Sequence, residues 1–475
     1  MNTAPQRTAR ARGWTLALTS VAFFMSALDA LVVITALPAI QRDLGAGVST
    51  LEWTVNAYTL ASAAGIITAA ALGDRLGRRR VFTAGLALFT AASAACALAP
   101  SPELLIAARA VQGLGAALVT PVSLTILATA FPPERRGAVV GIWGGVAGLA
   151  IASGPLVGGA VTQGLDWHWI FWVNVPIGLV VSILSVVRLP ESRGPATHLD
   201  LPAVGLVSGG AVSVVWGLVR AGELGWRSQE VVAALSLGSL LMAGFVAWER
   251  RSPHPMLPLR LFRNYAFTAA SVTSFLMTGG LFAGAFLVSQ YLQVALGSSP
   301  FDAGLRFLPM TATPLFVAPA TGVLSDRVGR RPVMVVGMLL LGSGLAWFAL
   351  VGTTSAGYEQ LVLPLLVAGI GASMSFATAP AAALSAVSAA DLGKASGTSN
   401  TLQRFGSAFA ISATTAVFAA NGHLGTSASF DAGFRPALTL AAGLALLGAI
   451  SALGVTRRQL QARAVPSGVP FPAAQ

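Results

Sequence analysis

Long apolar stretches separated by short polar loops recur along the whole chain. A helix needs about 20 mostly apolar residues to cross a bilayer. Only α-helices span lipid in this way while bonding their own backbone, so the pattern predicts an all-α polytopic membrane protein. The fourteen predicted spans are 14–37, 50–72, 81–99, 103–130, 138–162, 168–188, 200–220, 229–249, 266–291, 302–324, 332–352, 358–386, 397–420 and 434–455.

Arginine is unevenly shared between the predicted loops. If the chain begins in the cytoplasm, the inner loops and tails hold most of the arginines, and the outer loops hold little beyond Arg42, Arg227 and Arg435. This asymmetry is the positive-inside rule. We therefore expect both termini in the cytoplasm and a multi-pass protein of the inner (cytoplasmic) membrane, in a bacterial cell.

Composition agrees with lipid as the main solvent. The 475 residues are 55% hydrophobic and only 10% charged, whereas soluble chains carry about 25% charged residues. The net charge of +12 comes from short clusters between apolar runs, with no basic stripe, so no nucleic-acid partner is expected. A lone cysteine, Cys96, and four scattered histidines indicate neither a disulfide nor a metal site.

One loop motif occurs twice. Gly73–Phe82 follows the second predicted span and Ser325–Met334 follows the tenth, and six of their ten positions are identical. With the middle pair of spans set aside, both loops hold the same place in a six-span half. This predicts two six-helix pseudo-repeats plus an inserted pair, the architecture of alternating-access carriers. The expected boundaries are a tail 1–13, a bundle 14–188, a linker region 189–265, a bundle 266–455 and a tail 456–475.

The repeated loops have the chemistry of a cytoplasmic gate. Glycines permit a tight turn, arginines hold the loop in the cytoplasm, and an acidic residue can bond an arginine or a helix N-terminus. Such contacts would close the inner side in one state and break in the other. The alternative is a topology signal alone. The candidate gate residues are Gly73, Asp74, Arg75, Gly77, Arg78, Asp326, Arg327 and Arg330.

Four further motifs accompany these loops. They are Leu28–Pro38 in the first span, Leu105–Gly113 in the fourth, Gly148–Gly159 in the fifth and Trp167–Gly178 at the sixth. Together, over nearly the whole chain, they resemble the fourteen-span drug:proton antiporters of the major facilitator superfamily. One departure is His168, where members of that family more often have arginine. The resemblance implies the major facilitator fold and proton-driven drug export.

One acidic residue, Asp29, falls deep inside a predicted span. A charge at mid-membrane costs about 2.5–3.5 kcal/mol, so it needs a partner or a proton. Asp29 lies about 13 Å from the outer end of its span and Arg109 about 9 Å from that of its own. Similar depth in one half predicts an ion pair or a water-bridged contact, the alternative being two unrelated charges. A dry site favours protonated Asp29 and an approaching Arg109 favours release, so we expect this pair to couple protons to alternation.

Two further arginines fall inside predicted spans. Arg306 is expected to reach the outer interface, whereas Arg404 either lines the cavity or binds helix carbonyls. The resemblance implies lipophilic cations among the possible substrates. One buried negative charge against three positive weighs against a specialist for dications and favours neutral, zwitterionic or anionic amphiphiles at least as much. The candidate cavity residues are mainly polar or aromatic: Met25, Asn56, Tyr58, Gln112, Phe275, Met277, Phe282, Gln290 and Arg404.

The fifth predicted span is rich in glycine and contains one proline. Glycines four apart let helices approach closely, and a proline permits a bend. Ordinary tight packing accounts for this as well as a moving part does. The resemblance to an antiporter motif favours a hinge or a seal, made by Gly148, Gly154, Pro155, Gly158 and Gly159.

These observations predict a proton-coupled antiporter that exports small amphiphilic compounds (drugs, antibiotics or related metabolites) by alternating access. The nearest alternative is a proton-coupled symporter that imports a small organic solute. An enzyme would need clustered ligands or a nucleophile with its base, and direct use of ATP would need a phosphate-cradling loop; the sequence has neither. A sensor that no longer transports is disfavoured by Asp29 and Arg109. The expected partners are a small-molecule substrate, protons and lipid, with no cofactor, and the protein is expected to be monomeric.

Overall fold

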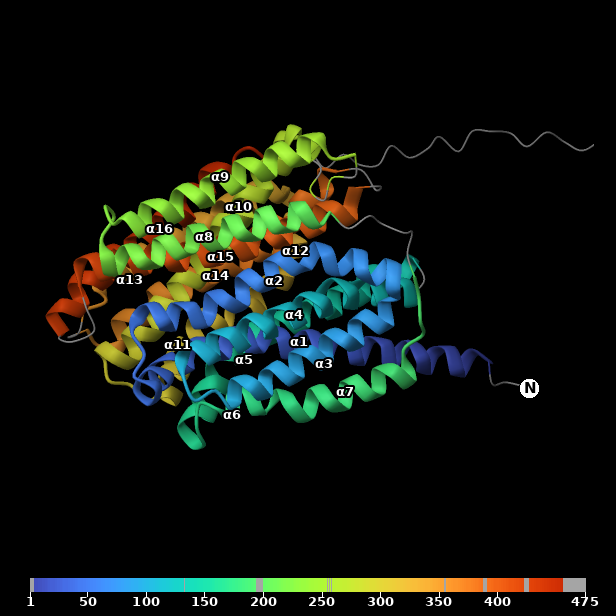
Figure 1. Cartoon of the computed structure of the whole chain (residues 1–475), viewed down its shortest axis with the longest axis horizontal. Helices are drawn as coiled ribbons and strands as arrows, with labels where there is room; N and C mark the ends of the chain where they lie inside the picture. Colours follow the sequence, from blue (N-terminus) through green and yellow to red (C-terminus); the bar gives the residue numbers. More distant parts are fainter. Residues whose placement is uncertain are drawn as a thin grey trace, which may run out of the picture.

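The computed structural model describes residues 4–131, 133–193, 200–253, 255, 257, 259–353, 356–387, 391–422 and 427–455, and every regular element among them is a helix. The helices run side by side along one direction (Figure 1). The N-terminal half contains α1 (Ala4–Leu44), α2 (Val48–Leu76), α3 (Arg78–Ala97), α4 (Pro102–Ala130), α5 (Pro133–Gly164), α6 (Trp169–Trp172) and α7 (Asn174–Arg188). Between the halves lie α8 (Leu201–Leu224), α9 (Gln229–Arg251) and a 3₁₀ turn, Leu259–Arg263. The C-terminal half contains α10 (Tyr265–Gln290), the π-helical turn Tyr291–Ala295, α11 (Pro300–Thr311), α12 (Thr313–Val328), α13 (Arg330–Val351), α14 (Tyr358–Ser385), α15 (Leu392–Asn421) and α16 (Ser427–Ala452).

Each predicted span overlaps a helix or two consecutive helices. In the described part of the chain, eleven helical segments are long and apolar enough to cross a membrane, or twelve if α2, which is bent by 49°, is included. The predicted span 302–324 is broken at Ala312, between α11 and α12. The break falls just before Pro314, because proline has no N–H to donate and disfavours helical geometry in the preceding residue.

The same helix pairs pack together in both halves. In the N-terminal half α2 and α3 pack on α4, and α5 packs on α1. In the C-terminal half α11–α12 and α13 pack on α14, and α15 packs on α10. Glycines make equivalent crossings possible: a Cβ on Gly115 of α4 would lie 2.6 Å from the Phe89 nitrogen of α3, and one on Gly371 of α14 would clash with the Leu341 nitrogen of α13.

Both copies of the repeated loop form the same turn. Gly77, with φ of 113°, ends α2 and precedes α3, and Gly329, with φ of 88°, ends α12 and precedes α13. Glycine adopts positive φ without the strain that a side chain brings. Each glycine donates its N–H four residues back, Gly77 to Gly73 at 3.1 Å and Gly329 to Ser325 at 3.0 Å. The sequence repeat is therefore also a repeat of backbone geometry.

The arginine-rich segments gather at one end of the bundle. α1 begins there, and Arg12 Nε donates to the Ala130 carbonyl at the end of α4 at 3.2 Å. Both repeated turns lie at this end because each helix, or broken helix pair, runs the length of the bundle once. It is the end that carries the N label in Figure 1. We call it the basic end and the other the opposite end.

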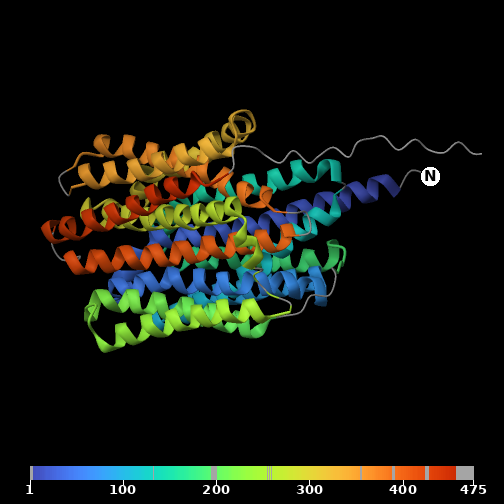
Figure 2. The same ribbon diagram turned by 90° about the horizontal axis from the view of Figure 1, so that it is seen from above.

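The helix pair between the halves covers one of the two seams. α8 and α9 pack on each other, and α8 also contacts α2 of one half and α15 of the other. An apolar cluster joins these three helices through Leu60, Val215 and Ala408. Figure 2 shows the pair at one edge of the bundle, next to α2 and α15.

Candidate functional site

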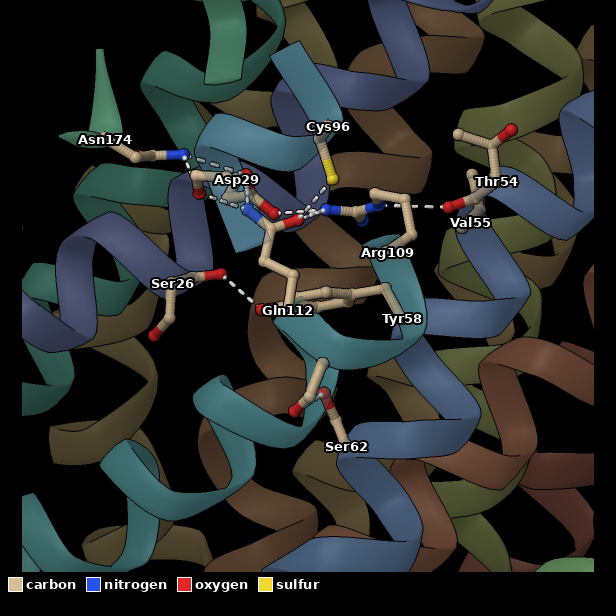
Figure 3. Close-up of polar contacts among 12 residues, drawn as sticks. Ser26, Asp29, Thr54, Val55, Tyr58, Ser62, Cys96, Arg109, Gln112 and Asn174 are labelled. Atoms are coloured by element: carbon tan, nitrogen blue, oxygen red, sulfur yellow. Dashed lines mark hydrogen bonds and ion pairs between the residues drawn. The ribbon is translucent and has the colours of Figure 1, made fainter. Parts of the chain in front are cut away.

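The carboxylate of Asp29 lies buried inside the N-terminal half, with its side chain only 1% exposed. Three side chains donate hydrogen bonds to it: Arg109 Nη1 to Oδ2 at 2.5 Å, Gln112 Nε2 to Oδ1 at 2.9 Å, and Asn174 Nδ2 to Oδ1 at 3.0 Å (Figure 3). An ionised carboxylate only accepts hydrogen bonds, so this arrangement fits the deprotonated form. The predicted contact between Asp29 and Arg109 is present as a direct ion pair.

The guanidinium of Arg109 is completely buried. Besides Asp29, it donates to Gln112 Oε1 at 2.5 Å and, through Nε, to the Thr54 carbonyl at 3.1 Å. Its central carbon lies 4.2 Å from the Tyr58 ring centroid, a cation–π contact. Nη2 has no hydrogen-bond partner among the described residues. The buried pair is thus well bound but leaves one donor unused.

Gln112 and Tyr58 fix the geometry of the pair. Gln112 is one turn after Arg109 on α4, and its Nε2 also donates to Ser93 Oγ of α3 at 2.6 Å. The Tyr58 hydroxyl donates to the Ser26 carbonyl of α1 at 2.9 Å, one turn before Asp29. Five helices (α1, α2, α3, α4 and α7) therefore hold one carboxylate in place.

Sequence reasoning missed two members of this network. Asn174 belongs to the motif at the sixth predicted span but was given no role, and its side chain reaches Asp29 from the first turn of α7. Ser93 on α3 carries no signal in the sequence, since an isolated serine in an apolar helix is common. Only the packing of α3 and α7 against α1 and α4 brings these groups to the carboxylate.

A second acid is buried near the start of a predicted span, although Asp29 remains the acid placed deep inside one. Glu52, five residues into α2, is 0% exposed and accepts a hydrogen bond from Asn56 Nδ2 at 3.2 Å. The same nitrogen lies 2.9 Å from Ser412 Oγ of α15 in the other half. Glu52 stands at the edge of the predicted span, where an exposed position was reasonable. It is buried because α15 packs over the first turns of α2.

Hydrogen bonds join the two halves at the opposite end. Ser289 Oγ donates to the Ile34 carbonyl at 3.1 Å, and Gln293 Nε2 donates to the Thr35 carbonyl at 2.8 Å. Both bonds link α10 or its π-helical turn to α1. Together with the bond from Asn56 to Ser412 between α2 and α15, they join the two halves toward the opposite end.

The glycines of α5 serve two different contacts. A Cβ on Gly154 would lie 2.7 Å from Leu31 Cβ, and one on Gly158 would clash with Thr35, so both glycines admit α1. A Cβ on Gly159 would instead clash with the Pro300 carbonyl of α11. In the same contact, a Cβ on Gly304 of α11 would lie 2.6 Å from the Pro155 carbonyl of α5. Part of the motif therefore packs α5 against the other half. Gly148 lies on α5, but its surroundings fall outside the described residues.

The predicted cavity residues lie in several places. Met25 packs in the core of the N-terminal half, whereas Met277 and Phe282 pack in that of the C-terminal half. The Phe275 ring lies 6.0 Å from that of Phe409. Arg404 is half-buried near the middle of α15.

Gln290 lines a small cavity near the opposite end. Its neighbours there are Leu51, Phe286, Leu287, Thr415, Phe418 and Phe430. Neither Gln290 amide atom nor the Thr415 hydroxyl has a hydrogen-bond partner among the described residues. The cavity volume of about 10 Å³ suits a single water molecule rather than an organic substrate.

The predicted gate residues bond within their own halves. Arg78 donates to Asp74 at 2.8 and 2.9 Å, and Glu191, which follows α7, accepts from the Arg79 backbone at 3.0 Å. Arg330 Nη1 donates to the Ala381 carbonyl of α14 at 3.1 Å. A Cβ on Gly73 would lie 3.1 Å from the Val122 side chain. Arg75 and Arg327 are exposed, and the side chain of Asp326 lies outside the described residues.

The departure at His168 is accommodated in the loop before α6. His168 Nδ1 lies 2.5 Å from Asp166 Oδ1, and its ring stacks on Trp167. Partial burial raises the pKa of Asp166, and hydrogen bonds from the His168 backbone and ring lower it. Together the lowering effects are larger, so the pKa of Asp166 lies below its usual value. An arginine is thus not needed to pair this carboxylate.

Two repeated helical halves, a buried ion pair inside the N-terminal half, and helices long enough to span a bilayer define a polytopic membrane transporter. The family model described as "Major Facilitator Superfamily" matches residues 19–289 and 270–473. The chain belongs to this superfamily, whose members are transporters rather than enzymes.

Its relatives include resistance and export proteins. The tetracenomycin C resistance and export protein of Streptomyces glaucescens is 38% identical over 339 residues, which are 71% of this chain and 63%, or less than two thirds, of that protein. The methylenomycin A resistance protein of Streptomyces coelicolor is 33% identical over 93% of this chain and 92% of its own length. Multidrug resistance protein Stp of Mycobacterium tuberculosis is 35% identical over 86% of this chain and 76% of its own length.

Solved structures share the fold. The peptide transporter POT in complex with sulfate has a TM-score of 0.66 at 19% identity, covering 94% of this chain and 96% of that one. A mutant of the nucleoside transporter NupG has a TM-score of 0.62 at 14% identity, covering 93% of this chain and 99% of that one. At such identities the likeness concerns the fold alone.

Proposed function

We propose that this protein is a proton-coupled antiporter that exports small amphiphilic compounds (drugs, antibiotics or related metabolites) across the cytoplasmic membrane of a bacterium. The observation that carries the proposal is the buried ion pair of Asp29 and Arg109. A carboxylate enclosed by donors in a dry interior is a group whose protonation changes the contacts between helices. The resistance and export functions named for the relatives support drug efflux as the direction.

The topology that goes with this function has fourteen spans. To the eleven apolar segments and the bent α2 we add α5 and α15, which have 32 and 30 residues and are long enough to cross a bilayer. An even number of spans puts both termini on one side. The concentration of arginine at the basic end assigns that side to the cytoplasm.

The described state then faces the cytoplasm. Hydrogen bonds and close glycine contacts join the halves at the opposite end. At the basic end the two repeated loops, as far as they are described, bond only within their own halves. We assign the latter contacts to a cytoplasmic gate that assembles when the basic end closes. The other predicted gate residues shape or flank these loops: Gly73 and Gly77 lie in the first turn, and Arg75 and Arg327 are exposed beside the two turns.

Proton binding drives the change of state in this scheme. When the opposite end opens, an external proton reaches Asp29 and neutralises it. The attraction to Arg109 falls, and Gln112 and Asn174 lose an ionised acceptor. Protonation therefore favours a different arrangement of α1 against α4 and α7, in the sense of a shift between pre-existing states. Release of the proton to the cytoplasm restores the ion pair.

The proton gradient is the only energy source in this proposal, and the protein works as a monomer without a cofactor. A symporter would use the same carboxylate, so the direction of transport separates the two functions. In intact cells that lack their own exporters, the antiporter lowers the intracellular drug concentration, and a protonophore abolishes the effect. Accumulation of the compound on expression would instead indicate import.

The decisive test is Asp29→Asn in proteoliposomes with an imposed pH gradient. The variant should bind substrate yet fail to concentrate it, because no carboxylate remains to carry the proton. Glu103→Gln, at an exposed carboxylate on the first turn of α4, is the matched control and should transport normally. Full gradient-driven accumulation by Asp29→Asn would disprove the coupling scheme.

A further inference from the structure

The interior holds two arginines that lie in very different surroundings. Arg109 is completely buried and bound by Asp29, Gln112 and the Thr54 carbonyl. Arg404, on α15, is half-buried, and among the described residues its guanidinium has neither an ion pair nor a hydrogen bond. A guanidinium inside a membrane protein is costly unless paired. Arg404 is therefore a cation in need of an anionic partner.

Arg404 lies near the middle of the membrane. α15 begins at Leu392, earlier than the sequence indicated, so twelve residues, or about 18 Å, separate its start from Arg404. One turn earlier, Thr401 Oγ1 contacts the Ala63 carbonyl of α2 at 3.5 Å. This contact aligns Arg404 with the middle of α2, at the depth of Tyr58 and hence of Arg109.

The side chain projects from the inner side of α15. Thr401 and Ser412 mark the face that meets α2. Phe405 lies about 40° around the helix from that face. It packs on the apolar cluster that contains Val215 of α8. Arg404 lies about 60° to the other side of that face, away from Phe405.

The same side of α15 is open toward the basic end. Asn400, one turn before Arg404, is exposed. Because α8 packs on α2 and α15 at the outer side of their seam, we take the exposed face at Asn400 to border the space between the halves. A solute entering from the basic end thus meets Asn400 and then Arg404.

Among the residues that the structure describes, no accessible carboxylate balances Arg404 at this depth. In the described part of the spans, Asp29 is enclosed by its three donors and Glu52 is buried near the opposite end. The interior reached from the basic end is therefore positive. Lipophilic cations would be repelled, whereas an organic acid would supply the missing charge and accept the fork of guanidinium hydrogen bonds.

We propose that Arg404 is the anion-recognition residue of the substrate site and that the preferred substrates are amphiphilic organic acids, bearing a carboxylate or an acidic phenol on an apolar skeleton. This inference rests on the proposed export function and specifies its substrate class. Asn400 is placed to bind polar groups one turn closer to the entrance.

Equilibrium binding to the purified full-length protein in detergent tests the inference without any proton gradient. The probes are an aromatic carboxylic acid dye and its uncharged methyl ester. Arg404→Gln should weaken binding of the acid about ten- to hundredfold and leave the ester nearly unchanged, while Arg404→Lys should retain part of the preference. Arg306→Gln removes an arginine already held by Ser298 and the Tyr358 ring, so it should change neither affinity.

Two results of the binding experiment would overturn the inference. One is equal loss of acid and ester in Arg404→Gln, which would indicate a structural role. The other is complete loss of acid binding in the wild type on adding phosphatidylglycerol, which would assign the arginine to a lipid headgroup. Proton-driven export of the ester without a preference for the acid would refute this inference and leave the antiporter intact. Binding of the acid without gradient-driven transport would refute the antiporter proposal and leave the assignment of Arg404 intact.

Discussion

At the scale of single residues, the chemistry depends on how many donors face one carboxylate. Arg109, Gln112 and Asn174 all stabilise the ionised form of Asp29, and each removal shifts the balance toward the protonated form. Truncating one member of a buried ion pair costs about 3–5 kcal/mol. The neutral donors, Gln112 and Asn174, are therefore better probes of coupling. Their loss changes the balance between the ionised and protonated carboxylate without leaving an unpaired charge.

Asn174→Leu should raise the pH at which transport is half-maximal. A hydrogen bond to a charged group contributes about 1.5–3 kcal/mol, and 1.36 kcal/mol corresponds to one pH unit. Because the lost donor binds the ionised carboxylate, the midpoint of transport should rise by about one to two pH units. The measurement is the initial rate of substrate–proton exchange in proteoliposomes as a function of pH.

The Asp29→Asn background supplies the control for Asn174→Leu. Without a carboxylate to tune, Asn174→Leu should produce no further change in any pH dependence that remains. A shift of the same size in that background, or a downward shift in the wild type, would show that Asn174 acts elsewhere.

At the scale of elements, glycine decides how closely the helices approach. A Cβ on Gly115 would lie 2.6 Å from the Phe89 nitrogen of α3, and Gly371 makes the corresponding contact between α14 and α13. The apolar periodicity predicted that these segments are helices, but it could not predict which glycines lie in a crossing, because that depends on the rotation of each helix toward its neighbour.

Gly115→Ala should destabilise the protein by about 1–3 kcal/mol, since backbone atoms of α3 must move to admit the methyl group. Gly371→Ala should behave alike because the two crossings are repeats of each other. The measurement is the thermal unfolding midpoint in detergent, which should fall by several degrees.

Gly205→Ala is the matched control, since a Cβ there would meet nothing within 4 Å. Alanine has a higher helix propensity than glycine, by about 1 kcal/mol, so this variant should be as stable as the wild type or more so. If all three variants have the same midpoint, the close crossings do not limit stability.

At the scale of the whole molecule, the two halves meet along two seams that differ. The seam of α2 and α15 is covered by α8, through Leu60, Val215 and Ala408. The seam of α5 and α11 relies on direct backbone packing at Gly159 and Gly304. Alternation must separate both at the opposite end, so the second seam is the more sensitive to small changes in volume.

Gly304→Val should favour the state open at the opposite end, because its Cβ would lie 2.6 Å from the Pro155 carbonyl of α5. Spin labels on exposed, repeat-related positions report the change by pulsed electron paramagnetic resonance. The pair Leu98→Cys and Leu350→Cys should move apart, and the pair Leu76→Cys and Val328→Cys should move together. Both pairs are made in a Cys96→Ala background, since Cys96 is the only native thiol.

Ser412→Ala should shift the same distances in the same direction but less. It removes the bond from Asn56 across the covered seam, worth about 1 kcal/mol, without forcing the helices apart. Unchanged distances in both variants would mean that these contacts do not hold the opposite end closed.

The sequence by itself determined the helical class, the positions of the long apolar helices and the duplicated turn, and it predicted a contact between Asp29 and Arg109 that the structure shows to be a direct ion pair. These follow from local rules: apolar length, glycine at positive φ, and the cost of a charge in lipid. Only the tertiary structure decided that Asn174 and Ser93 complete the set of side chains around the carboxylate, that Glu52 is buried beneath α15, and that Gln290 borders a water-sized cavity. It also decided that Arg404 is half-buried with no ion pair among the described residues. Each of these depends on how helices distant in sequence are rotated against one another, and an apolar pattern in which most faces of a span are equally hydrophobic does not specify that rotation.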